Sequence, residues 1–259
     1  MFQNRFDDEK HSLRLSEDGS YTAYSKEYNE HYHSTKDGAF SESLQKHIIP
    51  AYNLTREKNE IYILDICYGL GFNTLATILY YKEHAPQKKL FIYSPELDVS
   101  LVKSLINFNY PKEFEPLREI IEAVSQDGLY EDENFRVEVF LGDARKYVRR
   151  FEKKFDVVYQ DAFSPSVNPM LWTQEYFADI KNSLREDGII TTYSTALKTR
   201  LALYNNGFLV YLNKGEVFRN ATLASCKLLA NYELVNMEHK IACNPDVRPI
   251  KDEELFLSH

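Results

Sequence analysis

Residues 61–73 decide the fold, and they read Ile-Tyr-Ile-Leu-Asp-Ile-Cys-Tyr-Gly-Leu-Gly-Phe-Asn. The first six residues form a continuous apolar run rich in isoleucine, which is typical of a strand buried in a parallel sheet. Gly69 and Gly71 follow directly, and a helical pattern begins near Asn73. Glycine lets the backbone approach a ligand closely, and a helix N-terminus presents free N–H groups. The stretch therefore predicts a strand, a ligand-binding turn and a helix, although many tight turns contain such a glycine pair.

The same alternation of strands and helices continues along the chain. Further strands are expected at 89–93, 136–141, 155–160 and 188–194, and helices at 73–81, 97–108, 144–151, 174–184 and 196–205. The last two strands, 208–212 and 221–229, have no helix between them, so we expect an antiparallel hairpin at one edge. The pattern predicts an α/β fold with a Rossmann-like, doubly wound and mainly parallel sheet. This ending is typical of class I methyltransferases.

The length of 259 residues suits one large α/β domain with appendages. The expected parts, in chain order, are an N-terminal extension at 1–57, a core domain at 58–229 with an acidic insertion at 111–135, and a tail at 230–259. Within the extension, 21–25 and 30–34 are expected to be strands. Residues 39–52 are expected to form a helix that Pro50 ends.

Composition narrows the class of protein. Hydrophobic residues make up 44% and charged residues 27%, which is ordinary for a globular domain. No apolar run approaches the ~20 residues of a membrane helix, and the start of the chain is too charged for a secretory signal. We therefore expect a cytoplasmic protein without a membrane partner. Cys67, Cys226 and Cys243 lie far apart, which predicts neither a disulfide framework nor a metal site.

The net charge of −8 gives no global attraction for nucleic acid, so RNA binding would need a local basic patch. Residues 145–154 are the densest patch, with six basic residues in ten positions. This run is either a solvated helix face or a phosphate contact, and the sequence leaves both interpretations open. His31 and His33 share one face if their segment is a strand, but no third ligand accompanies them, so we expect no metal there.

Acidic residues follow the second and third core strands. Glu96 lies about 25 residues after the glycines, where a carboxylate accepts hydrogen bonds from ribose hydroxyls. Helix capping is the alternative role, although Asp98 is the better N-cap candidate. Asp143 and Ala144 follow Gly142 after the next strand. Methyltransferases that use S-adenosylmethionine commonly place an acid there against the adenine, whereas nicotinamide-binding folds do not. The combination therefore favours S-adenosylmethionine over NAD.

Residues 161–173, Asp-Ala-Phe-Ser-Pro-Ser-Val-Asn-Pro-Met-Leu-Trp-Thr, follow the expected strand 155–160. Asp161, Phe163 and Pro165 would then lie at the carboxyl end of a strand, where open α/β sheets bind their ligands. A simple helix-entry turn explains Pro169 and Thr173. It does not explain Asp161-Ala-Phe-Ser-Pro. We therefore expect this loop to grip the reacting group of a substrate.

These motifs resemble the methyltransferase domain of the MnmC-type tRNA 5-methylaminomethyl-2-thiouridine biosynthesis proteins, in the free-standing form without the oxidase half. The resemblance covers most of residues 20–228. Its motifs are Tyr68-Gly-Leu-Gly-Phe-Asn73, Gly142-Asp143, the loop 161–173, Arg200 ahead of Asn206-Gly207-Phe208, and Tyr32-His33-Ser34.

Three positions depart from the family pattern. Cys67 stands where the first glycine of the turn is usual, Asp65 replaces a more usual glutamate, and Arg219-Asn220 stands where a Lys-Arg pair is common. A cysteine at a glycine position matters because its Cβ disfavours positive φ. We expect this change to crowd the cofactor turn slightly.

The resemblance implies N-methylation of the 5-aminomethyl group of wobble uridine, or 2-thiouridine, in tRNA. It implies S-adenosylmethionine as cofactor, no FAD, no metal, tRNA as partner, and upstream tRNA-modifying enzymes that supply the amine. The implied catalytic residues are Asp161, Phe163 and Pro165. The implied cofactor residues are Tyr68, Gly69, Gly71, Asn73, Glu96, Asp143, Ala144 and Asp161. The implied substrate or RNA contacts are Tyr32, His33, Trp172, Arg145, Arg149 and Arg200.

Within this scheme Asp161 is interpreted as an orienting hydrogen-bond acceptor for the amine rather than a strong base. Two other functions remain open. An aminopropyltransferase of the spermidine-synthase type has a related fold and acids at similar strand ends, but its glycine-rich signature is not seen. A non-catalytic RNA- or nucleotide-binding module, with Cys67 marking a decayed cofactor turn, is the other.

Overall fold

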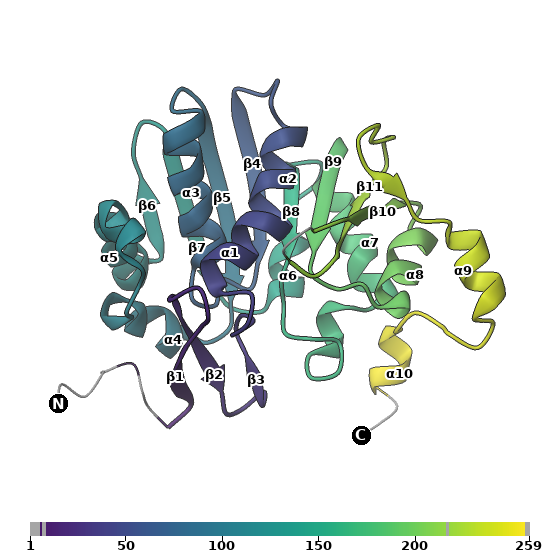
Figure 1. Ribbon diagram of the computed structural model, residues 1–259, viewed down its shortest axis with the longest axis horizontal. Helices are drawn as coiled ribbons and strands as arrows, with labels where there is room; N and C mark the ends of the chain where they lie inside the picture. Colours follow the sequence, from purple (N-terminus) through teal and green to yellow (C-terminus); the bar gives the residue numbers. More distant parts are fainter. Residues whose placement is uncertain (1–5, 7–8, 216–217, 257–259) are drawn as a thin grey trace.

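A nine-stranded sheet with helices on both faces forms the body of the molecule (Figure 1). The computed structural model describes residue 6 and residues 9–215 and 218–256, so parts of the expected extension and tail lie outside it. Strand order is β12-β10-β11-β9-β8-β4-β5-β7-β6. The strands of this sheet are β4 (Glu60–Ile66), β5 (Lys89–Glu96), β6 (Leu129–Glu131), β7 (Phe135–Leu141), β8 (Phe155–Gln160), β9 (Leu184–Thr192), β10 (Leu209–Asn213), β11 (Ala221–Ser225) and β12 (Glu233–Leu234).

The centre of the sheet, from β7 to β9, is parallel, and β6, β11 and β12 run against their neighbours. The predicted doubly wound, mainly parallel sheet with an antiparallel C-terminal pair is therefore confirmed. Strand β11 inserts between β9 and β10, so the edge on this side is β12. From β4 the chain moves to β5 on one side, and β8 pairs with β4 on the other. The carboxyl ends of β4 and β8 thus form the switch point where such sheets bind ligands.

Both faces of the central strands are buried, which explains the unbroken apolar run in the sequence. Ile61 and Ile63 of β4 belong to one core cluster, and Leu64 and Ile66 belong to the other. This alternation follows from the pleat of a strand. The fourteen helical segments described are α1 (Ala39–Ser43), η1 (Leu44–Ile48), α2 (Ile49–Leu54), α3 (Phe72–His84), α4 (Val99–Ser104), η2 (Leu105–Asn107), η3 (Lys112–Leu117), α5 (Arg118–Asp127), α6 (Ala144–Val148), η4 (Pro169–Leu171), α7 (Gln174–Ser183), α8 (Leu197–Asn205), α9 (Met237–Cys243) and α10 (Asp252–Phe256).

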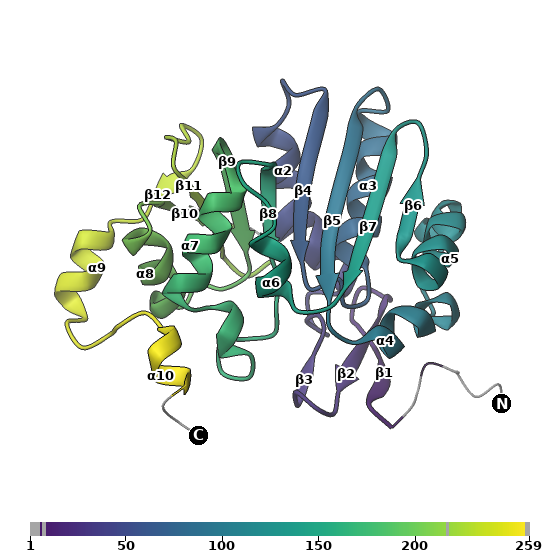
Figure 2. The same cartoon turned by 180° about the vertical axis from the view of Figure 1, so that it is seen from behind.

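The N-terminal segment adds a small antiparallel sheet of β1 (His11–Leu15), β2 (Tyr21–Ser25) and β3 (Glu30–His31). It lies beyond the carboxyl ends of the parallel strands (Figure 2). Strand β1 was not predicted, and the expected strand 30–34 is shorter. The prediction that Pro50 ends the following helix is wrong, because helix continues to Leu54. Pro50 lies in the first turn of α2, where a missing N–H is tolerated.

Between α1 and α2 the chain makes a π-helical turn, η1. There the N–H of Ile49 donates to the carbonyl of Leu44, five residues earlier. A π turn is wider than an α turn. Three consecutive side chains, Lys46, His47 and Ile48, are accordingly buried.

The expected tail is joined to the core. Its strand β12 pairs with β10, and Asp252 of α10 contacts Arg145 of α6. The expected insertion contains η3 and α5 and ends in β6, which pairs with β7. No helix of the described residues is long and apolar enough to cross a membrane.

Candidate active site

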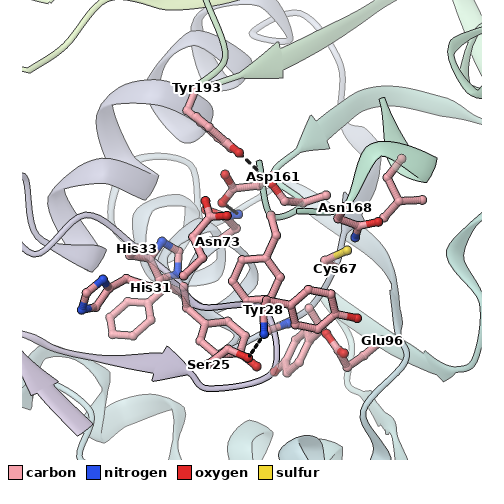
Figure 3. A pocket seen from close by; sticks show the side chains of 18 of the residues that line it. Ser25, Tyr28, His31, His33, Cys67, Asn73, Glu96, Asp161, Asn168 and Tyr193 are labelled. Atoms are coloured by element: carbon pink, nitrogen blue, oxygen red, sulfur yellow. Dashed lines mark hydrogen bonds between the residues drawn. The ribbon is translucent and has the colours of Figure 1, made fainter. Parts of the chain in front are cut away.

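A cavity of about 1320 Å³ lies at the carboxyl ends of the central strands, between the large sheet and the small N-terminal sheet of β1, β2 and β3 (Figure 3). Each of the central strands contributes a lining residue at its end or from the turn that follows it. These are Gly69 after β4, Glu96 at the end of β5, Asp143 after β7, Asp161 after β8 and Tyr193 after β9. The topology thus brings the sequence-predicted acidic residues into one space.

The turn after β4 has left-handed backbone at three positions, with φ of 67° at Cys67, 53° at Gly69 and 77° at Gly71. Cys67 therefore adopts a conformation that favours glycine, which agrees with the expected crowding of this turn. A Cβ on Gly71 would lie 2.8 Å from the Tyr68 hydroxyl oxygen, so only glycine fits there. Cys67, Tyr68 and Gly69 line the cavity, whereas Gly71 is not among the described lining residues and acts as the N-cap of α3.

Glu96 connects the turn after β4 to the end of β5. Its Oε2 accepts the N–H of Gly69 at 2.9 Å, and its Oε1 accepts the N–H of Asp98 at 2.9 Å. Burial raises the pKa of Glu96, and these backbone hydrogen bonds only partly offset the rise. Asp98 is the N-cap of α4. Asp98 therefore takes the capping role that was the alternative for Glu96, which leaves Glu96 lining the cavity.

Asp143 occupies the N-cap of α6, where its Oδ1 accepts the N–H of Lys146 at 2.8 Å. The residue is exposed to solvent and lines the cavity together with Ala144. Its carboxylate therefore keeps free acceptor capacity toward a ligand.

Asp161 lies at the inner part of the cavity with its side chain 11% exposed. Its Oδ2 accepts a hydrogen bond from Asn73 Nδ2 at 2.8 Å, and its Oδ1 lies 3.5 Å from His47 Nε2. Burial acts to raise the pKa of Asp161, but the nearby rings of His47 and His33 and the amide of Asn73 hold it below its ordinary value. Asp161 is therefore ionised at neutral pH.

A second buried carboxyl group, that of Asp65, also contacts the side-chain amide of Asn73. Asn73 Nδ2 lies 3.4 Å from Asp65 Oδ1, and Thr74 Oγ1 donates to Asp65 Oδ2 at 2.8 Å. Burial raises the pKa of Asp65 to about 7, although the bond from Thr74 acts against the rise. Asn73 thus bridges one ionised and one partly protonated carboxyl group.

The small N-terminal sheet and its turns contact the loop that follows β8. Glu30 accepts hydrogen bonds from both the N–H and the hydroxyl of Ser164, the latter at 2.8 Å. The ring of Phe163 stacks on Tyr28 with centroids 4.8 Å apart, and it contacts Tyr32 at 4.9 Å. These three rings form one aromatic wall of the cavity. Pro165 is not among the described lining residues. It lies in a turn that is closed by a hydrogen bond from the N–H of Val167 to the carbonyl of Ser164.

Four of the expected RNA contacts have partners within the folded chain. Trp172 is 1% exposed, and its Nε1–H donates to the carbonyl of Phe163 at 2.7 Å, so it supports the loop from inside. Arg145 borders the cavity, but its guanidinium is held by the Asp252 carboxylate through hydrogen bonds of 2.8 and 2.5 Å. Arg149 pairs with Asp179 outside the cavity. Arg200 is half-buried and donates to Thr222 Oγ1.

Tyr32 and His33 do line the cavity as expected. The Tyr32 hydroxyl lies 3.1 Å from His11 Nε2, and the His33 ring packs edge-on against Phe72. Burial lowers the pKa of His33, although the carboxylates of Asp161 and Glu42 act against this.

Sequence reasoning missed several residues of this site. His47 lies in a segment whose helical pattern rests only on apolar positions, and Tyr28 and Tyr193 are two among 19 tyrosines. Lys36 and Arg219 are exposed at the cavity, and Arg219 stands out in the sequence only as a departure from the family pattern. No described group of three or more His, Cys, Asp or Glu side chains has an arrangement suited to a metal ion.

Comparison with known proteins gives concordant relationships. The family described as S-adenosyl-L-methionine-dependent methyltransferase matches residues 114–227. The crystal structure of MNMC2 from Aquifex aeolicus superposes with a TM-score of 0.80 at 34% identity, covering 97% of this chain and 83% of that one. The uncharacterized protein MJ0670 of Methanocaldococcus jannaschii is 30% identical over 96% of this chain and 70% of its own length.

The bifunctional MnmC protein of Aeromonas hydrophila, named for tRNA 5-methylaminomethyl-2-thiouridine biosynthesis, is 28% identical over 83% of this chain. This chain spans only 35% of that protein's length. The relatives favour methyl transfer over the aminopropyl transfer considered from the sequence. The chain belongs to the MnmC-type methyltransferase family, whose members are S-adenosyl-L-methionine-dependent methyltransferases.

Proposed function

We propose that this protein transfers a methyl group to the primary amine of 5-aminomethyluridine, or its 2-thio form, at the wobble position of tRNA. One observation carries the proposal: Asn73 directly joins the carboxylate of Asp161 to the helix that follows the glycine turn. A reacting group held by Asp161 would then lie beside a cofactor held by that turn. The names of the Aeromonas and Aquifex relatives support this substrate class.

The residues present fit S-adenosylmethionine. Glu96 offers partly buried carboxylate oxygens to the ribose hydroxyls, and Asp143 offers exposed acceptors to the adenine amine. The Asn73 Oδ1 atom is buried without a hydrogen-bond partner among the described residues, so it is available to a ligand group. A Cβ on Gly69 would lie 3.2 Å from the Tyr32 ring, so the backbone rather than a side chain faces this part of the cavity. When bound, the cofactor supplies a methyl group activated by its positive sulfonium.

Asp161 orients the amine. An aliphatic amine is mostly protonated at pH 7, and it must lose a proton before its lone pair can attack. Desolvation in the cavity favours the neutral amine, whereas a carboxylate favours the ammonium. Because Asp161 is ionised, it accepts a hydrogen bond from the amine and fixes the direction of the lone pair, with the reacting atoms about 3 Å apart. Its main contribution is therefore position.

We assign recognition of the nucleoside to the aromatic wall of Tyr28, Tyr32 and Phe163, because a pyrimidine ring stacks on such surfaces. Lys36 and Arg219 at the cavity offer positive charge to the phosphates of the anticodon loop, despite the net charge of −8. The substrate amine would come from upstream tRNA-modifying enzymes. In this scheme residues 58–229 are the methyltransferase domain, and the described part of residues 1–57 closes its cavity.

A direct assay tests the proposal. The protein is incubated with S-adenosylmethionine and an anticodon stem-loop that carries 5-aminomethyluridine at the wobble position, and the nucleosides are separated by mass spectrometry. We expect the modified nucleoside to gain the mass of one CH2 and stem-loops with plain uridine or an acetylated amine to stay unchanged. Methylation of the plain stem-loop would contradict the proposed acceptor. Transfer to putrescine from decarboxylated S-adenosylmethionine would instead support the aminopropyl alternative.

A further inference from the structure

His47 is fully buried at the back of the active site, and its two ring nitrogens face different partners. Nδ1 lies 2.7 Å from the hydroxyl oxygen of Thr191 on β9. Nε2 lies 3.5 Å from Asp161 Oδ1, which is too long for a good hydrogen bond. Nε2 is a buried polar atom without a hydrogen-bond partner in the described part of the chain. An unsatisfied nitrogen thus faces the carboxylate that is proposed to hold the substrate.

The ring of His47 is positioned by an uncommon backbone conformation. His47 belongs to the π-helical turn η1, and such turns occur frequently at functional sites. The turn buries His47 between Lys46 and Ile48, and the ring lies against Tyr159 of β8 with centroids 5.4 Å apart. A buried imidazole contributes little apolar area, so leucine or methionine would serve a purely packing role at least as well. The position therefore suits a role for the ring nitrogens.

We propose that His47 and Asp161 form one proton-accepting pair, in which His47 is the positioning residue that takes up the proton released by the substrate amine. This inference rests on the proposed function, because it assigns a destination to the proton of that amine. Thr191 contacts Nδ1, so Nε2 is the ring atom that faces the carboxylate of Asp161.

The proton moves from the substrate to the imidazole before the methyl group is transferred. An N–H bond of the substrate ammonium breaks, and its proton passes through the Asp161 carboxylate to His47 Nε2. The positive charge moves from the amine to the imidazolium, which lies beside the ionised Asp161. The neutral amine then forms its N–C bond as the donor's C–S bond breaks, which gives a secondary ammonium and a neutral thioether. His47 returns its proton to water after the product leaves, so one proton is released for each methyl group transferred.

Other titratable groups surround the pair and set its response to pH. Asp65, His33, Tyr159 and Tyr193 face it from neighbouring elements, Lys46 lies on η1 itself, and Glu42 lies on the preceding helix α1. Lys46 pairs with Glu42 at 2.5 Å and with Asp37 at 3.4 Å, so two carboxylates share its ammonium group. Asp161 is the acidic group in direct contact with the His47 ring.

The first test needs no substrate. Ring nitrogens of the seven histidines are followed by NMR in the 15N-labelled full chain, and the contact between the His47 and Tyr159 rings identifies the His47 signals. In Asp161→Asn the Nε2 signal of His47 should move while its Nδ1 signal stays close to the wild-type position, because only Nε2 faces the carboxylate. An unmoved Nε2 signal would overturn the pair. This arm keeps His47 in place, so it holds even where His47→Gln fails to fold.

The second test uses the stem-loop assay and measures single-turnover rates between pH 6 and 9. The wild-type rate should rise with pH over this range, because the substrate amine must lose its proton before it attacks. His47→Gln should lower the rate roughly 100-fold and remove that rise, while KM for RNA changes little. His84→Gln is the matched control, because His84 is exposed on α3 and its ring nitrogen bonds to the carbonyl of Tyr80. A uniformly slower His47→Gln enzyme with the wild-type pH profile would overturn the proposal.

The two arms separate this inference from the proposed function. A His47 Nε2 signal that responds to Asp161→Asn, without methyl transfer to the stem-loop, would support the pair and contradict the proposed substrate. Methyl transfer with an unmoved Nε2 signal would contradict the pair and leave the proposed function standing.

Discussion

Asn73 donates its side-chain amide to Asp161, with Nδ2 2.8 Å from Oδ2. Asn73 lies in the first turn of α3, directly after the glycine turn, and Asp161 follows β8. The hydrogen bond therefore connects the turn proposed to bind the cofactor with Asp161, the residue proposed to hold the substrate amine. The two lie at the switch point of the sheet. The turn proposed to hold the cofactor and the carboxylate proposed to hold the substrate amine are therefore in direct contact.

Asp161→Asn should lower turnover by about 100-fold or more, because the amine loses its charged acceptor and the pair loses its negative member. Binding of S-adenosylmethionine should change little, since Glu96 and Asp143 remain. Single-turnover rates and calorimetry measure the two effects. Asp187→Asn, which removes an ion pair with Lys58 away from the cavity, is the control and should leave turnover intact. Normal turnover of Asp161→Asn with saturating RNA would refute the assigned role.

Cys67→Gly should stabilise the protein. The left-handed conformation costs a residue with a Cβ about 1–2 kcal/mol, and glycine's greater freedom in the unfolded chain takes back about 0.5–1 kcal/mol. We expect a net gain of roughly 0.5 kcal/mol in the free energy of unfolding, measured by urea denaturation. Cys67→Ala keeps the Cβ and should show no such gain. Equal effects of the two substitutions would mean that backbone strain at this position is unimportant.

Asp65 should make stability depend on pH. Its pKa of about 7 in the folded state lies above the ordinary value of 3.8, so the folded state binds more protons between these limits. The free energy of unfolding should therefore fall by up to about 1.4 kcal/mol for each pH unit between about 4 and about 7, and be level above that range. The advantage of wild type over Asp65→Asn in urea unfolding should shrink between pH 5 and about 7 and then stay constant. A constant difference would show that the pKa of Asp65 is not raised.

Lys36→Ala and Arg219→Ala should weaken binding of the stem-loop without changing affinity for S-adenosylmethionine. Each lost phosphate contact should reduce the slope of log affinity against log salt by about 0.7–0.9. Fluorescence anisotropy at several salt concentrations measures this slope. Lys89→Ala is the control, because Lys89 is exposed at the amino end of β5, on the opposite edge of the sheet. If neither Lys36→Ala nor Arg219→Ala changes the slope of log affinity against log salt, the RNA binds elsewhere.

Strands buried on both faces were predictable, because burial on two sides imposes a continuous apolar run. The predicted strand 155–160 coincides with β8, and 61–66 differs from β4 by one residue. The strand-end acids were also predictable, since parallel strands deliver their carboxyl ends to the same edge. The sequence left the roles of Glu96 and Asp98 open, and the hydrogen bonds of the folded chain distinguish them.

Contacts between distant residues were not predictable from local pattern. The π turn leaves no mark in helical periodicity, so in the sequence His47 is only a polar residue beside an apolar stripe. Arg145 pairs with Asp252, which lies 107 positions away, and no local rule connects the two. Trp172 was predicted to contact RNA, and the carbonyl that holds its indole inside the protein is brought there only by the folded loop.

A crystal structure with bound S-adenosylhomocysteine tests the proposed site most directly. We predict that the ribose lies against Glu96, the adenine beside Asp143 and the sulfur facing Asp161 within the cavity. A ligand bound outside this cavity, or bound in it with the sulfur directed away from Asp161, would contradict the proposed placement of donor and acceptor.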